Sequence, residues 1–262
     1  MRPAGGIRVG LRRAALAAFA RVNPGDVRIR HHYTGQPFVL HSFRHKGYWF
    51  HGRRREQDEM AAFARLVRPG ARVLEVGGHI GYTSLYLASL VGERGAVHVF
   101  EPGANNLPYL LRNTSACAQV RVLAAAAGRH DGTACLYLED LTGQNNSLVA
   151  DFAGLAANAR LAVRARVTTQ EVTLTSLDSY CAHAGFAPDF IKIDVEGWEF
   201  DVLCGARTVL REHRPALMVE VQDHRAEIAA LLASEGYRLL TARGEPLAAL
   251  PDGTVNVFCL PW

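Results

Sequence analysis

The chain has 262 residues, 49% of them hydrophobic, which is enough for one large α/β domain and too little for two of full size. Its formal net charge is +4, but the basic residues form no stripe long enough to follow a nucleic-acid backbone, so we expect no nucleic-acid partner. The five cysteines are odd in number and include no C-x-x-C pair, which argues against a disulfide framework or a zinc site.

Residues 1–56 are predicted to be an N-terminal extension that offers a surface to the acceptor or to a second copy of the chain. Residues 10–22 have the composition of a helix, and the alternation at 38–40 and 48–50 predicts short strands or a hairpin. The apolar run at 14–20 is too short for a signal peptide, and no stretch reaches the roughly 18 residues of a membrane-spanning helix. We therefore expect a soluble, cytoplasmic protein without a membrane partner.

Residues 57–262 are predicted to form the main domain, in which short β-branched runs alternate with helical patterns. The expected strands are residues 73–76, 96–100, 120–123, 190–195 and 217–221, and the expected helices are 82–91, 105–113, 199–211 and 225–235. Such alternation predicts a mostly parallel sheet with helices on both faces. Residues 237–240 and 255–260 predict a closing antiparallel hairpin, and residues 134–139 and 163–172 predict extra strands around a polar loop at 143–147.

A glycine-rich loop follows the first of these strands, where Glu75 precedes Gly77, Gly78 and Gly81. Glycines at a strand-to-helix turn allow a ligand to approach the backbone closely. The spacing is G-x-x-x-G rather than the G-x-G-x-x-G of dinucleotide folds, and Glu75 would repel a pyrophosphate, which disfavours an NAD-dependent oxidoreductase. The loop is better suited to a cationic ligand that carries an amino acid group.

Acidic residues end two further strands. Glu101 ends the next strand, where a carboxylate can accept hydrogen bonds from both ribose hydroxyls of an adenosine-containing ligand. Asp194 and Glu196 end a later strand, and at positions i and i+2 they point to the same side. Because open α/β folds bind ligands at this edge of the sheet, we expect both beside the reacting groups. Glu199 is interpreted mainly as a charge in the first turn of a helix.

On these residues the sequence resembles the FkbM family of S-adenosylmethionine-dependent methyltransferases. The resemblance covers roughly residues 57–221 and is most specific in the run Ile191-Lys192-Ile193-Asp194-Val195-Glu196-Gly197. The other matching segments are Glu75 to Tyr82, Phe100-Glu101-Pro102, Asn113, Ser176-Leu177-Asp178 and Glu199. The family usually has Asp in place of Glu75 and Asn in place of His79, so His79 is expected to alter contacts to the methionine part of the cofactor.

The resemblance implies a class I methyltransferase with a Rossmann-like α/β fold. Its sheet would be mostly parallel and seven-stranded, in the order 3-2-1-4-5-7-6, with an antiparallel last strand and helices on both faces. It also implies S-adenosylmethionine as cofactor, with its methionine part over Gly77 to Gly81, its ribose on Glu101 and its adenine near residues 125–128. The implied cofactor-binding residues are Glu75, Gly77, Gly78, His79, Gly81, Tyr82, Glu101, Pro102, Ala125, Ala126 and Asp194. On this placement, Gly77→Val is expected to abolish cofactor binding without unfolding the protein.

Methyl transfer from a sulfonium is an in-line displacement in which the enzyme positions the acceptor and removes its proton. A hydroxyl acceptor benefits from a base, and we expect Asp194 in this role, with Glu196 and His224 as further candidates. The expected activity is O-methylation of a small molecule, such as a sugar moiety or another natural product.

Two alternatives remain open. In a metal-assisted O-methyltransferase, Mg²⁺ would lie against two acceptor oxygens, held by Asp194, Glu220 or Asp223, and His224; a metal is not predicted for this chain. In the second alternative, a non-catalytic assembly protein keeps the fold and binds the cofactor without turnover. The expected partners are a small-molecule acceptor and, in a homo-oligomer, further copies of the chain.

Overall fold

The computed structural model describes residues 21–139, 143–152 and 167–262. The helix expected at 10–22 lies outside the described residues except for its last two positions. The first residues of the strand expected at 163–172 also lie outside them. Within the described ranges, every helix is too short or too polar to cross a membrane.

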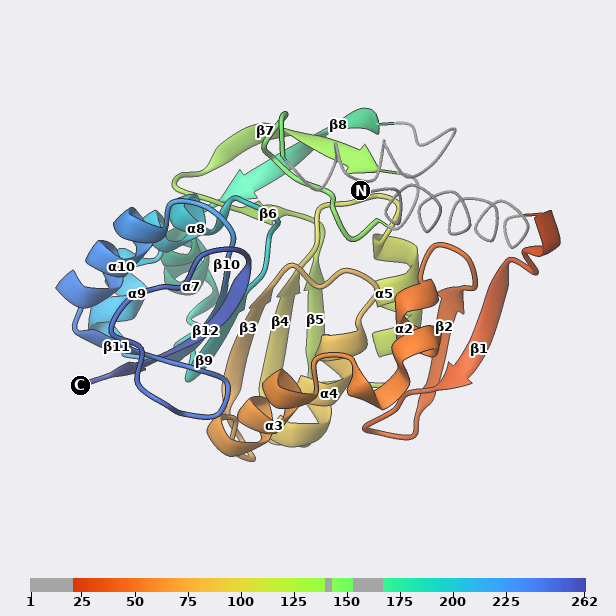
Figure 1. Ribbon diagram of the computed structural model, residues 1–262, viewed down its shortest axis with the longest axis horizontal. Coiled ribbons are helices and arrows are strands. Elements are labelled where there is room, and N and C mark those ends of the chain that lie inside the picture. Colours follow the sequence, from red (N-terminus) through yellow and green to blue (C-terminus); the bar gives the residue numbers. More distant parts are fainter. Residues whose placement is uncertain (1–20, 140–142, 153–166) are drawn as a thin grey trace, which may run out of the picture.

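A seven-stranded sheet forms the centre of the molecule, in the order β11-β12-β10-β9-β3-β4-β5 (Figure 1). Its strands are β3 (Arg72–Val76), β4 (Ala96–Phe100), β5 (Val120–Leu123), β9 (Phe190–Ile193), β10 (Ala216–Val221), β11 (Tyr237–Leu240) and β12 (Val255–Pro261). Neighbouring strands are parallel except where β12 pairs with β10 and β11. The predicted strand order and the antiparallel last strand are therefore confirmed.

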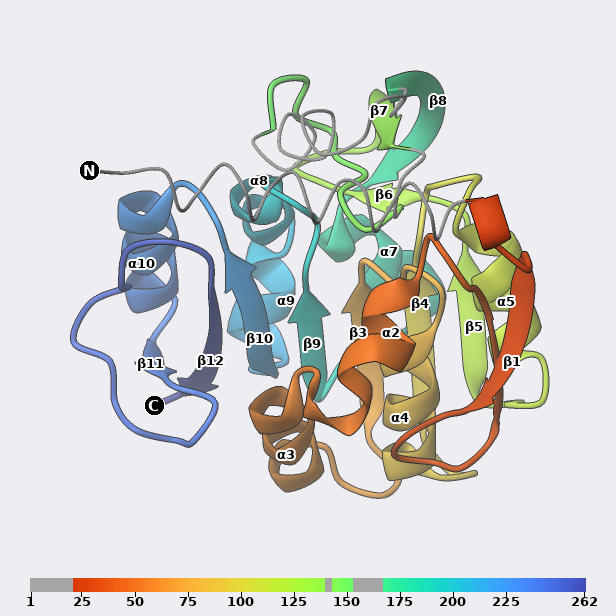
Figure 2. The same cartoon turned by 45° about the vertical axis from the view of Figure 1, so that its right-hand side comes forward.

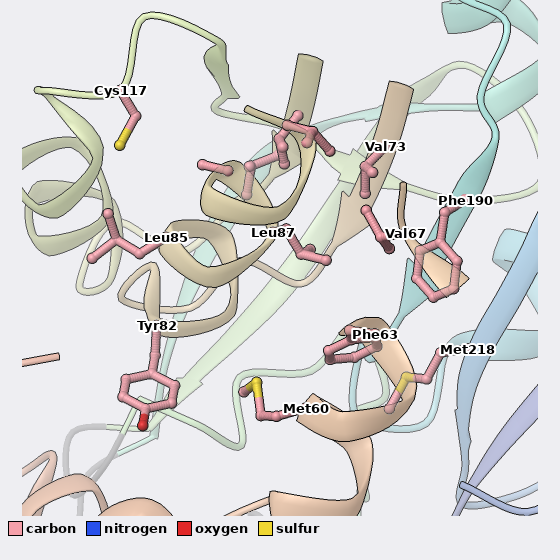
Figure 3. Packing of buried hydrophobic residues seen from close by; sticks show 14 of the residues in the cluster. Met60, Phe63, Val67, Val73, Tyr82, Leu85, Leu87, Cys117, Phe190 and Met218 are labelled. Carbon is pink, nitrogen blue, oxygen red and sulfur yellow. The ribbon is translucent and has the colours of Figure 1, made fainter. Parts of the chain in front are cut away.

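Helices cover both faces of this sheet (Figure 2). One face carries α3 (Gln57–Leu66), α4 (Tyr82–Val91) and α5 (Leu107–Thr114), and the other carries α7 (Leu177–Ala184), α8 (Glu199–Cys204), α9 (Arg207–Glu212) and α10 (Arg225–Ser234). Alternate residues of a strand face opposite layers, so Val73 packs in the first hydrophobic cluster and Leu74 in the second. Figure 3 shows the first cluster, in which the rings of Phe63 and Phe190 meet edge to face at 5.7 Å.

The single helix expected at 199–211 is divided into α8 and α9. The division falls at Gly205, where an added Cβ would lie 2.0 Å from the carbonyl oxygen of Gly128. Two backbones can approach this closely only where one residue lacks a side chain. A tertiary contact therefore interrupts a segment whose local pattern is helical.

The described part of the N-terminal segment shares the core of the main domain. It contains the antiparallel pair β1 (Asp26–Arg30) and β2 (Pro37–His41), then α2 (Lys46–His51) and the 3₁₀ turn η1 (Gly52–Arg54). The backbone of Val39 in β2 donates to Asn113 Oδ1 at 2.7 Å and accepts from Asn113 Nδ2 at 2.9 Å. Asn113 lies in α5, so these bonds tie the hairpin to the sheet's own helical layer.

The strand expected at 48–50 is wrong, because these residues belong to α2. Three consecutive aromatic residues are compatible with the period of a strand and with that of a helix, and the burial of their side chains distinguishes the two. Tyr48 is buried in the first hydrophobic cluster, whereas Phe50 is 72% exposed. The helix therefore packs the Tyr48 side chain against the main domain, where the prediction had one face of a strand.

A second sheet lies above the carboxyl ends of the central strands in both views (Figures 1 and 2). It consists of β6 (Ala126–Ala127), β8 (Val167–Thr175) and β7 (Gly132–Glu139), in that spatial order. β7 and β8 confirm the extra strands for the described residues, and β6, with only two residues, was not predicted. Ser147 of the polar loop pairs with Tyr137 of β7, so the loop is held against this sheet.

Candidate active site

A pocket opens at the carboxyl ends of β3, β4, β9 and β10, the edge at which open α/β sheets bind ligands. The loops after these strands, the polar loop at 143–147 and part of the second sheet surround it. The N-terminal segment adds Tyr48, Arg55 and Glu56 to its lining. The predicted site residues that line it are Glu75, Gly77, Gly78, His79, Tyr82, Glu101, Pro102, Ala125, Ala126, Asp194 and Glu196.

The glycine loop is shaped by contacts within the chain itself. Gly77 has a φ of 90°, and a Cβ there would lie 1.8 Å from the carbonyl oxygen of Asp194. A Cβ at Gly78 would lie 2.3 Å from Val99 Cγ1. The expectation that Gly77→Val spares the fold is therefore wrong, because the side chain would first collide with the backbone that follows β9.

Three of the predicted residues have surroundings other than those expected. Gly81 is not among the pocket's lining residues, and an added Cβ would meet Leu110 of α5 at 3.0 Å. Tyr82 does line the pocket, but its ring is buried in the first hydrophobic cluster and its hydroxyl contacts His32 Nδ1 at 3.0 Å. His224 is exposed and stacks on Phe200 outside the lining, so the structure gives it no place beside the carboxylates.

Lys192 connects the ends of β3 and β9. Its Nζ lies 3.0 Å from Asp194 Oδ2, 3.1 Å from the carbonyl oxygen of Gly77 and 3.9 Å from Glu75 Oε1. Burial alone would lower the pKa of Lys192, but the charges of Asp194 and Glu75 raise it above its ordinary value. The lysine therefore remains cationic. Sequence reasoning gave it no role, although a lysine inside a buried apolar strand is a signal that could have identified it.

Glu75 is fully buried and accepts a hydrogen bond from Ser84 Oγ at 2.5 Å. Burial raises the pKa of Glu75 to about 7, and Lys192 and Ser84 oppose that rise. Its partners are groups of the protein, so its clearest role is to hold Lys192 and the start of α4.

Glu101 anchors the glycine loop as well as facing the pocket. Its carboxylate accepts hydrogen bonds from the backbone of His79 at 2.7 Å, the backbone of Gly103 at 2.9 Å and Asn106 Nδ2 at 3.3 Å. A carboxylate has about four acceptor positions, so these bonds leave about one for a ligand rather than the two expected. Burial raises the pKa of Glu101 to about 7, and the two backbone donors lower it.

Three carboxylates meet where β9 and β10 end. Oxygens of Asp194, Glu196 and Glu220 lie within 4.8 Å of one another, and Nε2 of Gln222 donates to Glu196 at 2.8 Å and to Glu220 at 2.6 Å. Burial, followed by the charge of Asp194, raises the pKa of Glu196 to about 8 and that of Glu220 to about 10. Glu220 entered the sequence analysis only as a metal-ligand alternative; an acid within the apolar strand β10 is the signal for it.

The loop between Asp194 and α8 is held by Glu199. Its Oε1 accepts the backbone N–H of Gly197 at 2.9 Å and that of Val195 at 3.4 Å, and the residue is 1% exposed. Glu199 is thus more than a charge at a helix start, because it determines the path of the chain that carries Glu196.

Backbone strain is concentrated at this pocket. Of the five non-glycine residues with positive φ in the described chain, Glu56, His79 and Glu196 line it. Such conformations cost about 1 to 3 kcal/mol each and persist where the surrounding structure holds them, often at binding sites.

The N-terminal segment reaches the glycine loop through Tyr48. Its hydroxyl lies 2.9 Å from His79 Nδ1, and the two rings stack with centroids 5.9 Å apart and planes 19° apart. The guanidinium of Arg55 lies over the Tyr48 ring, 4.6 Å from its centre. The N-terminal segment was expected to offer an acceptor or dimer surface, and the structure brings its Tyr48 and Arg55 into the lining of the pocket.

The pocket becomes apolar toward β5. Ala125, Ala126 and Ala127 follow that strand, and the apolar residues Leu136, Leu148 and Trp198 also line the pocket. The edge of the sheet therefore presents, from β5 to β10, an apolar region, Glu101, the glycine loop and the carboxylate cluster.

A family model described as the methyltransferase FkbM domain matches residues 75–239, a range that includes the glycine loop, Glu101 and the three carboxylates. A search of curated proteins found no match. One similar solved structure is the methyltransferase FkbM from Methylobacillus flagellatus KT, at 16% identity over 80% of this chain and 60% of that one, with a TM-score of 0.48. This chain thus spans less than two thirds of that protein's length.

Two further solved structures are similar at lower identity. The fibrillarin from Aeropyrum pernix, in complex with natively bound S-adenosyl-L-methionine, is 13% identical over 90% of this chain and 83% of its own, with a TM-score of 0.47. A SAM-dependent methyltransferase from Aquifex aeolicus is 14% identical over 80% of this chain and 94% of its own, with a TM-score of 0.43. Because the family model spans more than half of the chain, the protein belongs to the FkbM methyltransferase domain family.

Proposed function

We propose that the protein is an S-adenosylmethionine-dependent O-methyltransferase that acts on a hydroxyl group of a small molecule, such as a sugar moiety or another natural product. The observation that supports this best is the carboxylate cluster of Asp194, Glu196 and Glu220 at the edge of an FkbM methyltransferase domain. A neutral hydroxyl is a poor nucleophile until its proton is removed, and carboxylates placed together can accept that proton and bind neighbouring hydroxyls.

The spatial order of residues along the sheet edge is compatible with the order of the parts of S-adenosylmethionine. The apolar region after β5 suits an adenine, Glu101 has an acceptor position for a ribose hydroxyl, and the loop after β3 adjoins the remaining methionine part. When bound, this cofactor supplies the methyl group that is transferred.

Asp194 is the residue that we propose as the base. Glu196 and Glu220 hold their protons at neutral pH because burial raises their pKa values, whereas Asp194 forms an ion pair with Lys192 at 3.0 Å. In the proposed reaction the acceptor's hydroxyl proton passes to the Asp194 carboxylate. We propose that Glu196 and Glu220, which line the pocket beside Asp194, bind further hydroxyl groups of the acceptor.

Turnover with S-adenosylmethionine and a panel of glycosides and other alcohols tests this proposal, with the methylated atom located by NMR. Asp194→Asn keeps the shape of the side chain and should lower kcat by about 10²- to 10⁴-fold with little change in S-adenosylhomocysteine affinity. Asp223→Asn is the matched control, because Asp223 is exposed and outside the pocket lining. A loss of less than about threefold in Asp194→Asn, or methylation of nitrogen alone, contradicts the proposal.

A metal-assisted reaction is the second candidate, and the same cluster is the observation in its favour. Three carboxylate oxygens within 4.8 Å of one another match the oxygen ligands that Mg²⁺ prefers. The ligand set would then be Asp194, Glu196 and Glu220, since His224 lies outside the pocket lining. Activity that disappears in EDTA and returns with Mg²⁺ would select this mechanism.

Calorimetry separates the remaining classes. A non-catalytic assembly protein would bind S-adenosylhomocysteine but show no turnover on any acceptor. An oxidoreductase would bind NAD in preference to S-adenosylhomocysteine. Homo-oligomer formation stays a prediction, for which light scattering of the purified chain is the test.

A further inference from the structure

Arg55 is a pocket residue that lies outside the segment matched by the family model. It follows η1, and its side chain is 23% exposed. Nε lies 2.9 Å from Glu56 Oε1, and the guanidinium covers the Tyr48 ring at 4.6 Å. Gly47 leaves room for the group, since a Cβ there would lie 2.9 Å from Nη1.

This arrangement fixes the guanidinium relative to the glycine loop. Tyr48 lies between Arg55 and His79, stacked on the His79 ring and within 2.9 Å of its Nδ1. The backbone N–H of His79 in turn donates to Glu101 at 2.7 Å. A chain of contacts therefore leads from the proposed ribose site, past the loop that adjoins the methionine part, to Arg55.

Arg55 also has hydrogen-bonding capacity to offer a ligand. Besides His79, the lining contains two basic side chains, and Lys192 already contacts Asp194, Glu75 and the backbone of Gly77. Among the described residues, Nη1 and Nη2 of Arg55 have no hydrogen-bond acceptor. A planar fork of N–H donors with a fixed position matches a carboxylate, which it can bind with two parallel hydrogen bonds.

We propose that Arg55 binds the carboxylate of the cofactor's methionine part, an inference that rests on the proposed use of S-adenosylmethionine. The methionine part is the only region of that molecule with a carboxylate, and it would lie on the side of Glu101 away from the adenine. Arg55 is the cation at that end of the contact chain. The N-terminal segment thus completes the cofactor site of the FkbM domain.

The test compares two ligands that differ only in this carboxylate: S-adenosylhomocysteine and its decarboxylated analogue, which keeps the amino group. Isothermal titration calorimetry should show that the wild-type protein binds the first about 10- to 100-fold more tightly. Arg55→Met should remove most of that difference by weakening S-adenosylhomocysteine alone. Arg54→Met is the matched control, because Arg54 is the exposed neighbour outside the pocket lining and should leave both affinities unchanged.

Each other result has a distinct meaning. Equal weakening of both ligands in Arg55→Met, or an unchanged preference for S-adenosylhomocysteine, overturns the proposal. Unchanged cofactor affinity with a raised KM for a carboxylated acceptor overturns it as well and assigns Arg55 to the acceptor. If Arg55→Met does not fold, the affinities of both ligands for Arg55→Lys and for the wild-type protein test the proposal instead. A wild-type protein that binds neither ligand refutes the proposed function itself.

Discussion

Replacing Gly77 with alanine should destabilise the fold before it affects any ligand. Alanine at a φ of 90° carries a conformational strain of about 1 to 2 kcal/mol. Its Cβ would also lie 1.8 Å from the Asp194 carbonyl oxygen, although real Cβ contacts are essentially never shorter than 3.0 Å. The ends of β3 and β9 must then separate by more than about 1 Å, which breaks the 3.0 Å hydrogen bond from Asp194 N to Val76 O.

Together these effects should lower the free energy of unfolding by about 3 to 5 kcal/mol and Tm by roughly 10 °C. Urea unfolding followed by circular dichroism measures the first quantity and scanning calorimetry the second. Gly185→Ala is the matched control, because Gly185 also has a positive φ of 57° but a Cβ there meets nothing within 4 Å. That variant should lose only about 1 kcal/mol, since strain acts alone and is partly offset by lower entropy of the unfolded chain.

Equal destabilisation in the two variants would refute the reasoning, because the contact with Asp194 would then contribute nothing. A Gly77→Ala protein of wild-type stability that fails to bind S-adenosylhomocysteine would restore the ligand-approach interpretation that the structure has replaced.

Glu101→Ala should weaken S-adenosylhomocysteine binding by about 1 to 3 kcal/mol and lower the free energy of unfolding by about 2 to 4 kcal/mol, because the backbone N–H groups of His79 and Gly103 lose their acceptor. Titration calorimetry measures the first effect and urea unfolding the second. An unchanged affinity would contradict the assignment of Glu101 to the ribose. Burial raises the pKa of Glu220 from 4.5 to about 10, so the folded protein favours the protonated side chain. The resulting contribution of Glu220 to the free energy of unfolding is complete below pH 4.5 and is lost as the pH rises toward 10. Glu220→Gln imitates the protonated form and should flatten the Tm profile between about pH 5 and pH 9, whereas parallel profiles would show that Glu220 is not protonated in the folded state. The preference for S-adenosylmethionine over S-adenosylhomocysteine should increase over the same pH range as Glu196 and Glu220 ionise, and a constant ratio would place the sulfonium away from the cluster.

Much of the fold could be predicted from the sequence, because strands buried on both faces of a parallel sheet form short continuous apolar runs. β9 and β10 are such runs, and the alternation with helical segments restricts the topology further. The strand order itself came from the family resemblance rather than from periodicity. The errors occurred where a tertiary contact outweighed the local pattern, as at Gly205 against Gly128 and at Tyr48 against the first hydrophobic cluster.

For the site, the sequence by itself determined which acids end the strands, because the carboxyl ends of parallel strands converge at one edge. Asp194, Glu196 and Glu101 were predicted at that edge and line the pocket there. Local pattern contains no information about which segments distant along the chain meet, so Lys192 received no role and no residue of the N-terminal segment was assigned to the cofactor. His224 follows β10 in the sequence, yet it is exposed and stacks on Phe200 outside the pocket lining.

Only the tertiary structure decided how these groups are paired and protonated. The pKa of Glu196 is raised because the fold buries it beside Asp194, and the acceptor positions of Glu101 are mostly occupied because the fold brings backbone N–H groups to it. Desolvation and Coulombic interaction depend on distances between groups far apart in the chain. Those distances exist only once β3, β4, β9 and β10 lie side by side and the N-terminal segment packs against them.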